Sequence, residues 1–375
     1  MRIGITCYPT YGGSGAVAAE LGVGLAKMGH VVHFISYGLP FRINSFFKNI
    51  YFHEVEMLEY PLFKYPPYSL SLSVKMSEVI ESEKLDILHV HYAMPHATSA
   101  YLAQKMVGED KIKYVTTLHG TDITLVGSHS SFYKITKFSI ENSNGITCVS
   151  NYLKKSTEEI FKIKKDMRVI YNFVDTARYK RESMDRENLD FLKHIKKGDK
   201  VISHISNFRP VKKIQNIIKA FCKISREVQS KLLLVGEGPE AARCKIMVEK
   251  LKLEDKVFFL GRYDNIIPVL SASDLYMLPS KSESFGLSAL EALSCSVPVI
   301  GTNTGGLPEV VIDGQCGYLC DPNDIKSLAN RATEILCSEE LAKKMGREAR
   351  KRAKLFDSSI IVPQYINYYN EVLNN

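Results

Sequence analysis

The chain lacks several features that would mark common classes of protein. None of its eight cysteines forms a Cys-x-x-Cys pair, and the closest two, Cys316 and Cys320, have no His or Cys cluster beside them. This argues against a zinc site and a disulfide framework and indicates reduced thiols. No apolar run approaches the length that spans a bilayer, and the apolar start is too short for a signal peptide. We therefore expect a cytoplasmic protein with no stable membrane association.

A concentrated basic region is also lacking. The formal net charge of +8 divides into +3 up to Ile170 and +5 after it. The lysines between 162 and 165 are flanked by Glu158, Glu159 and Asp166, as is typical of a solvated helix face. We expect no nucleic-acid partner, while the modest surplus suits small anionic substrates.

What the chain does have is a regular alternation of short apolar runs and longer helical patterns. Its 375 residues exceed the size of a single growing core, so two domains are expected. Strand–helix alternation indicates parallel βαβ units. We therefore predict an α/β protein of two doubly wound, Rossmann-like domains. The predicted strands are 3–7, 31–36, 87–90, 114–118 and 146–149, then 201–205, 232–235, 257–260, 275–278 and 297–300.

The boundary between the two domains is expected near 171–175, before a polar stretch from Arg178 to Lys200. The first domain then covers 1–171 and the second 172–357. A last helical pattern, 358–375, is aromatic and apolar on one face. We expect it to pack back on the first domain, with a terminal helix of the second as the alternative.

The segment 282–293 points most directly to a ligand. It places Glu283 and Glu291 around a small turn that opens an apolar helix. Free N–H groups at a helix start attract phosphate, and carboxylates accept hydrogen bonds from sugar hydroxyls. The combination suggests a nucleotide sugar. Alternatively, Glu283 only offsets the helix dipole and Glu291 is a surface charge.

Other loops follow predicted strands, where open α/β sheets bind ligands. Gly12 to Gly15 open the first helix at an anion-binding position, but Ala18 breaks the dinucleotide fingerprint and no P-loop occurs. His89 is more typical of a buried, hydrogen-bonded histidine, whereas His119 ends its strand beside Thr121 and Asp122 and is the better candidate for chemistry.

The loop 207–213 gathers Arg209, Lys212 and Lys213 after the first strand of the second domain. Such cations would neutralise a diphosphate leaving group as its charge develops. An ordinary basic surface loop is the alternative.

In this order the motifs resemble the retaining GT-B glycosyltransferases of family 4. The most specific run is Gly236-Glu237-Gly238-Pro239, Glu283-Ser284-Phe285-Gly286-Leu287, Leu290-Glu291-Ala292 and Gly305-Gly306-Leu307-Pro308-Glu309. The first half is similar to family members that attach N-acetylglucosamine to L-malate in the first step of bacillithiol biosynthesis. That similarity rests on Gly4-Ile5-Thr6-Cys7-Tyr8-Pro9, Gly38-Leu39-Pro40-Phe41-Arg42 and Thr117-Leu118-His119-Gly120-Thr121-Asp122.

The resemblance implies that the two domains face each other across a cleft, with UDP-N-acetylglucosamine bound mainly to the second and L-malate to the first. By the same resemblance, Glu291 holds the ribose, Glu283 the sugar hydroxyls and Lys212 the diphosphate. The family arginine is replaced here by Asn207, which leaves open whether Asn207 or Arg209 contacts the diphosphate. The remaining donor contacts would be amides of Gly13, Gly15, Ser284, Phe285, Gly286 and Leu287.

The family chemistry is attack on the face that UDP leaves, with retention at the anomeric carbon. His119, Lys212 and Glu283 are then the candidate catalytic residues. Malate is a dianion and needs donors or cations, for which the candidates are Ser14, Arg42, Tyr92, Thr117 and Thr121. No Asp-x-Asp follows a strand, so we expect no metal and no other cofactor. A homo-oligomer is left open.

Three other functions fit the same motifs. One is a family-4 transferase with another small-molecule or lipid acceptor. A nucleotide-sugar epimerase of the same fold would release UDP without malate. A regulatory protein that binds the nucleotide sugar would show no turnover, although the presence of Glu283, Glu291 and Lys212 speaks against such decay.

Overall fold

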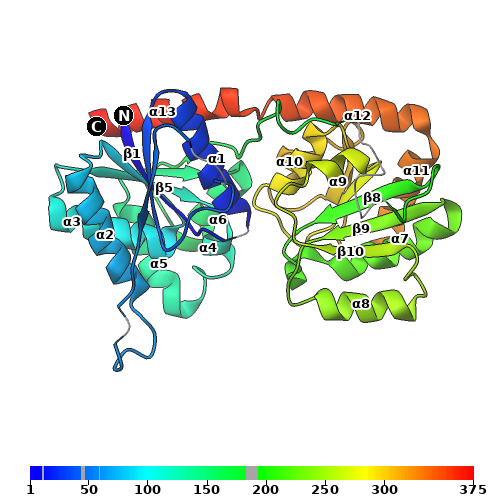
Figure 1. Ribbon diagram of the computed structural model, residues 1–375, viewed down its shortest axis with the longest axis horizontal. Helices are drawn as coiled ribbons and strands as arrows, with labels where there is room; N and C mark the ends of the chain where they lie inside the picture. Colours follow the sequence, from blue (N-terminus) through cyan, green and yellow to red (C-terminus); the bar gives the residue numbers. More distant parts are fainter. Residues whose placement is uncertain (11, 44–46, 59, 183–192) are drawn as a thin grey trace. The chain divides into compact units, whose positions relative to one another are not determined.

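The computed structural model describes residues 1–10, 12–43, 47–58, 60–182 and 193–375 (Figure 1). The chain forms two compact units. Unit 1 contains Met1–Asn172 and Ser358–Asn375, and unit 2 contains Phe173–Asp357. The division falls one residue after the expected boundary of 171/172. Residues 183–192 of the polar stretch 178–200 lie outside the described residues.

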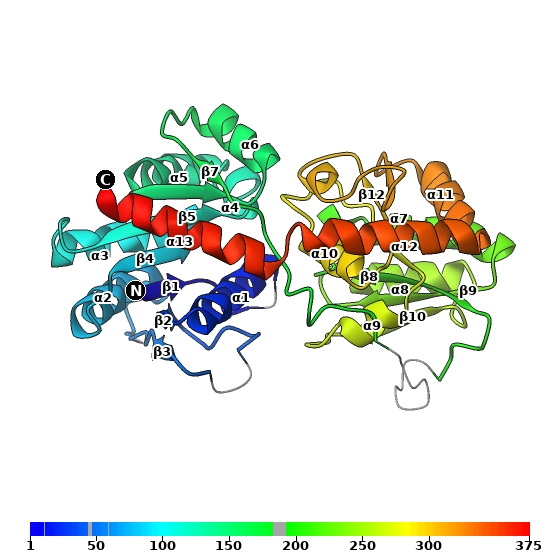
Figure 2. The same cartoon turned by 90° about the horizontal axis from the view of Figure 1, so that it is seen from above.

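Unit 1 is built on a seven-stranded parallel sheet of order β3-β2-β1-β4-β5-β6-β7. Helices α1 and α13 cover one face of this sheet, and α2, α3 and α5 cover the other (Figures 1 and 2). The strands are β1 (Arg2–Thr6), β2 (Val31–Ser36), β3 (Ile50–Glu54), β4 (Ile87–His91), β5 (Lys113–Leu118), β6 (Gly145–Cys148) and β7 (Arg168–Val169). The helices are α1 (Gly13–Lys27), α2 (Tyr68–Ser82), η1 (Ala93–Ala97), α3 (Thr98–Val107), α4 (Thr121–Thr124), α5 (Ser130–Asn142), α6 (Asn151–Phe161) and α13 (Ser358–Asn374).

The core of unit 1 follows from strands that are buried on both faces. All five residues of β4 are buried, as expected for a parallel strand between two helical layers. On the α2 side, Leu72 and Met76 pack with Leu88 and Tyr114 of the sheet. Each such side chain contributes roughly 1.5–3 kcal/mol on burial, so packing of the helical layers holds the sheet in place.

Helix α13 belongs to unit 1, although it is the last helix of the chain. Its face residues Ile361, Tyr365, Tyr368 and Tyr369 are buried. The Tyr368 hydroxyl accepts a hydrogen bond from the N–H of Ile146 (2.9 Å). Arg168 and Glu371 also join β7 to this helix as an ion pair (2.7 Å). The segment 358–375 therefore packs back on the first domain.

Unit 2 repeats the architecture with a six-stranded parallel sheet of order β10-β9-β8-β11-β12-β13. Its strands are β8 (Lys200–Ile205), β9 (Ser230–Val235), β10 (Val257–Gly261), β11 (Leu275–Leu278), β12 (Val299–Thr302) and β13 (Gly317–Cys320). Its helices are η4 (Pro210–Lys212), α7 (Ile214–Glu227), α8 (Ala241–Lys250), α9 (Ile267–Ala272), α10 (Leu287–Ser294), η5 (Leu307–Glu309), α11 (Ile325–Cys337) and α12 (Glu339–Lys354).

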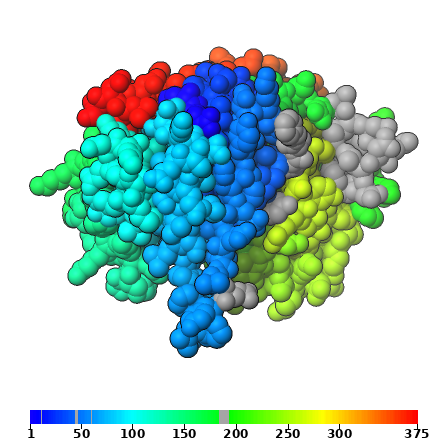
Figure 3. All heavy atoms as spheres, turned by 60° about the vertical axis from the view of Figure 1, so that its left-hand side comes forward, coloured from blue at the N-terminus to red at the C-terminus, as the bar shows by residue number. Residues whose placement is uncertain are grey.

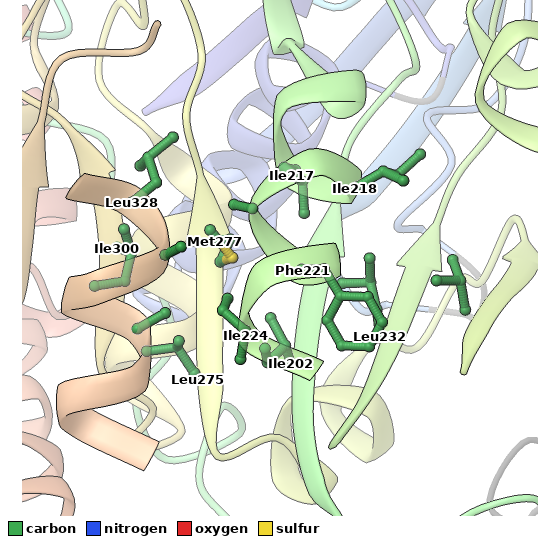
Figure 4. Packing of buried hydrophobic residues seen from close by; sticks show 14 of the residues in the cluster. Ile202, Ile217, Ile218, Phe221, Ile224, Leu232, Leu275, Met277, Ile300 and Leu328 are labelled. Atoms are coloured by element: carbon green, nitrogen blue, oxygen red, sulfur yellow. The ribbon is translucent and has the colours of Figure 1, made fainter. Parts of the chain in front are cut away.

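Helix α7 shows why the sequence folds in this way. Its apolar residues recur at helical spacing, and Ile217, Phe221 and Ile224 turn onto the sheet, where Ile202 and Leu232 meet them (Figure 4). An apolar stripe of this period can be buried on only one side of a helix. The stripe therefore sets the rotation of α7, and with it the direction of the loop before it, which carries Lys212.

All ten predicted strands are present, with ends that differ by at most two residues. The prediction missed three strands. β3 lies at a sheet edge and is not fully buried at any position, β7 has only two residues, and β13 is half-buried at its centre. Such strands lack the continuous apolar run by which central parallel strands are recognised. Among the described helices, none has both the length and the apolar character needed to cross a bilayer.

Candidate active site

In unit 2 the loops after β8 and β11 bring two predicted catalytic residues together. Lys212 ends the short helix η4, and its Nζ lies 2.7 Å from Oε1 of Glu283. Both side chains are largely buried, with 20% and 11% exposure. A partly buried pair of this kind keeps a cation and a carboxylate in fixed positions. The structure thus places a potential phosphate ligand beside a potential sugar-hydroxyl acceptor.

The backbone of Glu283 is held by the loop after β12. Its carbonyl accepts a hydrogen bond from the N–H of Gly306 (2.7 Å). Gly305 has φ +72°, and a Cβ there would lie 2.3 Å from the Glu283 carbonyl oxygen. Only glycine permits this approach and this backbone conformation without strain. The Gly305-Gly306 pair therefore positions Glu283 from a neighbouring strand end.

Helix α10 begins where its sequence predicted an anion-binding start. Gly286 precedes it in the left-handed conformation (φ 97°), and Leu287 is its first residue. The first turn contains no acidic residue and its N-cap makes no side-chain hydrogen bond, as suits a helix start that binds phosphate. Phe285 is buried and packs edge-on against Phe356 (5.7 Å). This anchors the loop that carries Ser284 to the body of unit 2.

Glu291 lies one turn into α10 and is buried, not a solvated surface charge. The hydroxyl of Tyr276 donates to the carbonyl of Ile205 (3.0 Å). Burial first, and then the nearby carboxylates of Glu291 and Glu283, raise the pKa of this hydroxyl. The Tyr276 hydroxyl thus lies at the last residue of β8, within electrostatic reach of both carboxylates. Their proximity could not be inferred from spacing alone.

Asn207 and Arg209 differ in their surroundings. The Asn207 Oδ1 is buried without a hydrogen-bond partner among the described residues, whereas Arg209 is exposed. A buried amide oxygen needs a donor, and phosphate oxygens only accept hydrogen bonds. Asn207 could therefore contact a diphosphate only through its NH₂ group, whereas the exposed side chain of Arg209 could contact an anion directly. Which of them contacts the donor stays a prediction.

In unit 1 the loops after β1, β4 and β5 also bring predicted residues together. The hydroxyl of Ser14 donates to that of Tyr92 (3.1 Å), and the Tyr92 ring lies 5.4 Å from the His119 ring. Tyr92 adopts a positive φ of 88°, which is uncommon for a residue with a side chain. Ser14, Tyr92 and His119 thus form one polar group at the carboxyl ends of the strands.

His119 is held by its neighbours. Its Nε2 lies 2.8 Å from Nδ1 of His91, and burial lowers the pKa of His119 to about 3. Asp122 accepts hydrogen bonds from the N–H groups of His119 (3.1 Å) and Gly120 (2.8 Å). A neutral imidazole fits a hydrogen-bonding contact better than a general base poised near neutral pH.

The structure also shows the surroundings of three further predicted acceptor residues, Thr117, Arg42 and Thr121. Thr117 corrects an expectation: its hydroxyl is buried and bonds to His89 Nε2 (2.7 Å) and Thr147 (2.6 Å). Because side chains alternate between the two faces along β5, Thr117 faces the helical layer that covers the sheet. There its hydroxyl bonds to His89 and is not a free donor. Arg42 pairs with Glu20 of α1 (3.4 Å). Thr121 begins α4 and is half-buried.

Gly13 and Gly15 have different roles at the start of α1. Gly13 is exposed as the first residue of the helix, after Gly12. A Cβ on Gly15 would lie 2.7 Å from the carbonyl oxygen of Tyr8. Gly15 is therefore required for close packing of the loop, while Gly13 offers its amide at a helix start.

Sequence reasoning missed several residues around these groups. Tyr8 packs against Tyr92 (5.4 Å) and His96 (4.6 Å), and the His96 Nδ1 meets the carbonyl of His91 (2.5 Å). The motifs after β1 and β4 are rich in aromatic residues, and this could have pointed to these contacts. No pattern in the sequence could have predicted the Arg42–Glu20 pair, because its two residues come from separate segments.

One group among the described residues has metal-binding side chains, His33, His53 and Glu83, with ligand atoms within 4.8 Å of one another. The guanidinium of Arg2 pairs with Glu83 (2.8 Å), and His33 Nδ1 lies 3.0 Å from His53 Nε2. A guanidinium beside the carboxylate opposes a cation. The group also lies apart from the strand ends that hold His119.

Comparison with known proteins identifies the family. Residues 11–178 match the family described as Glycosyltransferase Family 4, and residues 185–352 match Glycosyl transferases group 1. Over its whole length the chain is 50% identical to N-acetyl-alpha-D-glucosaminyl L-malate synthase of Bacillus anthracis, of which it covers 98%. The chain is a GT-B glycosyltransferase of family 4.

Other relatives of this glycosyltransferase agree. An uncharacterized glycosyltransferase of Methanocaldococcus jannaschii is 30% identical over 87% of the chain and 86% of its own. A crystal structure of a glycosyltransferase from Rickettsia africae has a TM-score of 0.80 at 25% identity, covering 100% and 99% of the two chains. Anabaena HepE with UDP and glucose has a TM-score of 0.83 at 20% identity, covering 99% of each chain, and shows the common fold. The predicted α/β class and family are confirmed.

Proposed function

We propose that this glycosyltransferase transfers N-acetylglucosamine from UDP-N-acetylglucosamine to the hydroxyl of L-malate, which is the first step of bacillithiol biosynthesis. The observation that carries the proposal is 50% identity over the full chain to the synthase of that name from B. anthracis. This similarity extends over both units of the chain. Retention at the anomeric carbon follows the family and is part of the proposal.

The donor would bind to unit 2. Glu291 would accept hydrogen bonds from the ribose hydroxyls and Glu283 from those of the sugar. The start of α10 and Lys212 would hold the diphosphate, with Arg209 or Asn207 as a further contact. This assignment is supported by the 2.7 Å approach of Lys212 to Glu283, since the diphosphate and the sugar it carries are themselves adjacent.

The chemical role of these groups is to stabilise a leaving group. Negative charge grows on the diphosphate as its bond to the sugar breaks, and Lys212 and the amides of α10 would meet that charge. Lys212 would exchange its contact with Glu283 for one with the diphosphate. His119, neutral and held by His91 and Asp122, would contact the transferring sugar without acting as a strong base.

The acceptor would bind to unit 1, near Ser14 and Tyr92. The Ser14 hydroxyl donates to that of Tyr92 (3.1 Å), and the Tyr92 hydroxyl could in turn donate to a carboxylate. Arg42 could provide a cation, although its charge is shared with Glu20. A malate carboxylate would then compete with Glu20 for the same guanidinium.

We further propose that the reaction needs no metal ion or other cofactor and takes place in the cytoplasm. Charge stabilisation by Lys212 and helix amides supports the first statement. The free state of all eight cysteines is compatible with the second.

The test is an assay of the purified full chain with UDP-N-acetylglucosamine, with and without L-malate. UDP release and product mass are measured, with EDTA in a parallel sample. We expect UDP release that depends on malate and a product with the mass of N-acetylglucosaminyl malate. Release without malate would indicate an epimerase, binding without release a regulatory protein, and no product with malate another acceptor. Each of these results would contradict the proposal.

A further inference from the structure

Unit 1 buries a carboxylate that no cation neutralises. Figure 3 shows how closely the side chains of α2 and α3, in light blue and cyan, cover the face of unit 1 that is turned to the viewer. Asp122 belongs to the interior of this unit, since only 3% of it is exposed. Among the described residues it forms no ion pair with a lysine or arginine. Burying a charge in this way is costly, so hydrogen bonds must compensate it.

The compensation comes from the backbone of two different loops. One oxygen of Asp122, Oδ1, accepts hydrogen bonds from the N–H groups of His119 (3.1 Å) and Gly120 (2.8 Å). The other oxygen, Oδ2, accepts one from the N–H of Ala93 (3.1 Å). His119 and Gly120 follow β5, whereas Ala93 follows β4. A single side chain therefore ties together the ends of two neighbouring strands.

The loop after β4 needs such a tie. Tyr92 has a positive φ of 88°, a conformation that persists in a residue with a side chain only where its surroundings hold it. The N–H of Tyr92 donates to the carbonyl of Thr117 (2.9 Å), and its carbonyl accepts from the N–H of Ala97 (3.2 Å). Asp122 holds the N–H of the peptide group that joins Tyr92 to Ala93, and so completes the support of this turn.

The loop after β5 is held by the same carboxylate. Gly120 has a φ of +115° and precedes the short helix α4. The two N–H groups that donate to Oδ1 belong to His119 and to the residue after it, so the backbone on both sides of the His119 side chain is fixed. The rings of His119 and Tyr92 lie 5.4 Å apart.

We propose that Asp122 is a positioning residue, whose carboxylate sets the separation between Tyr92 on the acceptor side and His119 on the sugar side. This inference rests on the proposed function for the roles of Tyr92 and His119. The carboxylate suits the task because both of its oxygens accept hydrogen bonds and neither carries a proton. An asparagine would offer one accepting oxygen and a donating NH₂ group, which cannot hold both loops.

A purely structural role would explain Asp122 less well. Burial raises the pKa of Asp122 to about 6, whereas an aspartate in an unfolded chain titrates near ~3.9. A carboxyl group whose pKa is higher in the folded state lowers the stability at pH values above that pKa. The ionised carboxylate therefore opposes folding at neutral pH, and its benefit must lie in what it positions.

The groups around Asp122 do not titrate near neutral pH. Burial lowers the pKa of His96 to about 4 and that of His119 to about 3, and it lowers the pKa of His91 well below its usual value. Burial also raises the pKa of Tyr8 to about 12 and that of the Cys148 thiol. A loss of activity near pH 6 that depends on Asp122 can thus be assigned to its own carboxyl group.

The first test compares Asp122→Asn with the wild-type chain in malate-dependent UDP release. We expect kcat to fall at least about tenfold and the KM for malate to rise, because displaced reacting groups lose their productive geometry. Affinity for UDP, measured by calorimetry, should stay the same, since the donor would bind to unit 2. Asp86→Asn is the matched control and should keep full activity: Asp86 also accepts from a backbone N–H, that of Arg2 (2.6 Å), but lies exposed before β4. Wild-type kinetics in Asp122→Asn would overturn the proposal.

Two further measurements separate positioning from a structural role. In urea at pH 7.5, Asp122→Asn should unfold at no lower concentration than wild type, because it removes a charge that opposes folding. The kcat/KM of wild type should fall with an apparent pKa near 6 as the pH is lowered, and Asp122→Asn should lack this step. A variant that loses stability together with activity overturns the proposal, as does a step near pH 6 that both proteins share.

Failure of the proposed function would be recognised separately, as wild-type protein that releases no UDP with malate. The contacts of Asp122 are then tested by amide hydrogen exchange with mass spectrometry. Segments 92–97 and 119–124 should exchange at least about tenfold faster in Asp122→Asn than in wild type, while segments of unit 2 stay unchanged. Equal exchange of both segments in the two proteins would show that Asp122 does not hold these loops.

Discussion

Lys212 and Glu283 form a charged pair for which we propose a role in the reaction. A largely buried ion pair is weak evidence for stability, because the loss of hydration offsets the attraction between the charges, and this one lies where two strand-end loops meet. When a diphosphate binds, the Lys212 ammonium could exchange its contact with Glu283 for one with the phosphate oxygens. The pair is therefore better explained by ligand binding than by the fold.

Replacing Lys212 by alanine should lower kcat by roughly a hundred-fold or more, because the leaving diphosphate loses one preorganised charge. The measurement is steady-state UDP release with saturating N-acetylglucosamine donor and malate. Lys219→Ala makes the same change on an exposed position of α7 and should keep full activity. Near-normal turnover of the Lys212 variant would remove this residue from the mechanism.

Glu291→Ala should weaken UDP binding by about ten- to a hundred-fold, since hydrogen bonds to a charged acceptor contribute roughly 1.5–3 kcal/mol. Calorimetry with UDP provides the affinity, and thermal unfolding shows whether the buried site still folds. Glu291→Gln keeps an acceptor oxygen and should recover part of the loss. Equal UDP affinity in wild type and Glu291→Ala would rule out the ribose contact.

The loops between elements, more than the helices and strands themselves, carry the candidate site. Glu283 lies in the loop after β11, but the loop after β12 holds its backbone. In the same way, His119 follows β5 while His91 ends β4. Neighbouring parallel strands bring their carboxyl ends to one edge of the sheet, and this explains why residues more than twenty positions apart share a site.

Gly305→Ala tests the hold of one loop on the other. A Cβ at this position would lie 2.3 Å from the Glu283 carbonyl oxygen, so Glu283 must move and UDP release should fall at least about tenfold. Gly314→Ala is a matched control, because Gly314 has the same φ of +72° but no atom within 4 Å of its added Cβ. Gly314→Ala should lower the free energy of unfolding by only roughly 1–2 kcal/mol, which is the cost of a side chain in the left-handed conformation. Equal activity of both variants would contradict the positioning role.

The histidines at the ends of β4 and β5 predict a pH dependence of stability. Burial lowers the pKa of His89 and His119 to about 3 and that of His96 to about 4. The unfolded chain takes up protons below pH 6.5 while the folded histidines stay neutral, so acid favours unfolding. Asp122 has the opposite effect on stability, because burial raises its pKa to about 6. It is a single group, however, and the effect of the several histidines is larger.

The free energy of unfolding should therefore fall as pH is lowered from 6.5 to 4, by on the order of 3 kcal/mol for a single such histidine. Urea titration followed by circular dichroism is suitable, since the chain has no tryptophan. A His89→Gln variant should show a shallower dependence on pH. Equal stability at pH 7 and pH 4 would show that these histidines are not held neutral.

Across the molecule, the two units share one topology but differ in how they are completed. Unit 1 uses the last helix of the chain as part of its α1-side layer, where Val362 packs on Gly24 and Tyr369 bonds to His89 (2.7 Å). Unit 2 closes within a single segment of sequence. The end of the chain therefore stabilises its beginning.

Removing residues 358–375 should destabilise unit 1 and leave unit 2 folded. The deletion exposes a row of buried aromatic and aliphatic side chains, each of which contributes roughly 1.5–3 kcal/mol. Limited proteolysis with mass spectrometry should yield a resistant fragment close to 173–357, with unit 1 digested. A milder variant, Tyr369→Phe, loses one hydrogen bond and should cost unit 1 about 1–2 kcal/mol. Protection of unit 1 in the truncated chain would contradict this assignment.

Much of the fold was accessible from local pattern. Central parallel strands are apolar on both faces, so their runs could be recognised one by one, and glycine-rich loops after them indicated where ligands bind. Edge strands such as β3 escaped because half-exposed residues carry no such run. Thr117 was misjudged for a related reason: the end of a strand could be located, but not which face its last residues serve.

Patterns a few residues long were thus enough for the α/β class, the division into two units and the segments that bear Glu283, Lys212 and His119. They depend on backbone conformation and apolar spacing, which neighbouring residues set. The partners of those side chains could not be predicted in this way. Gly305 beside Glu283, Glu20 beside Arg42 and Tyr369 beside His89 come from distant segments, and such contacts exist only once the strands have assembled and their helices have packed.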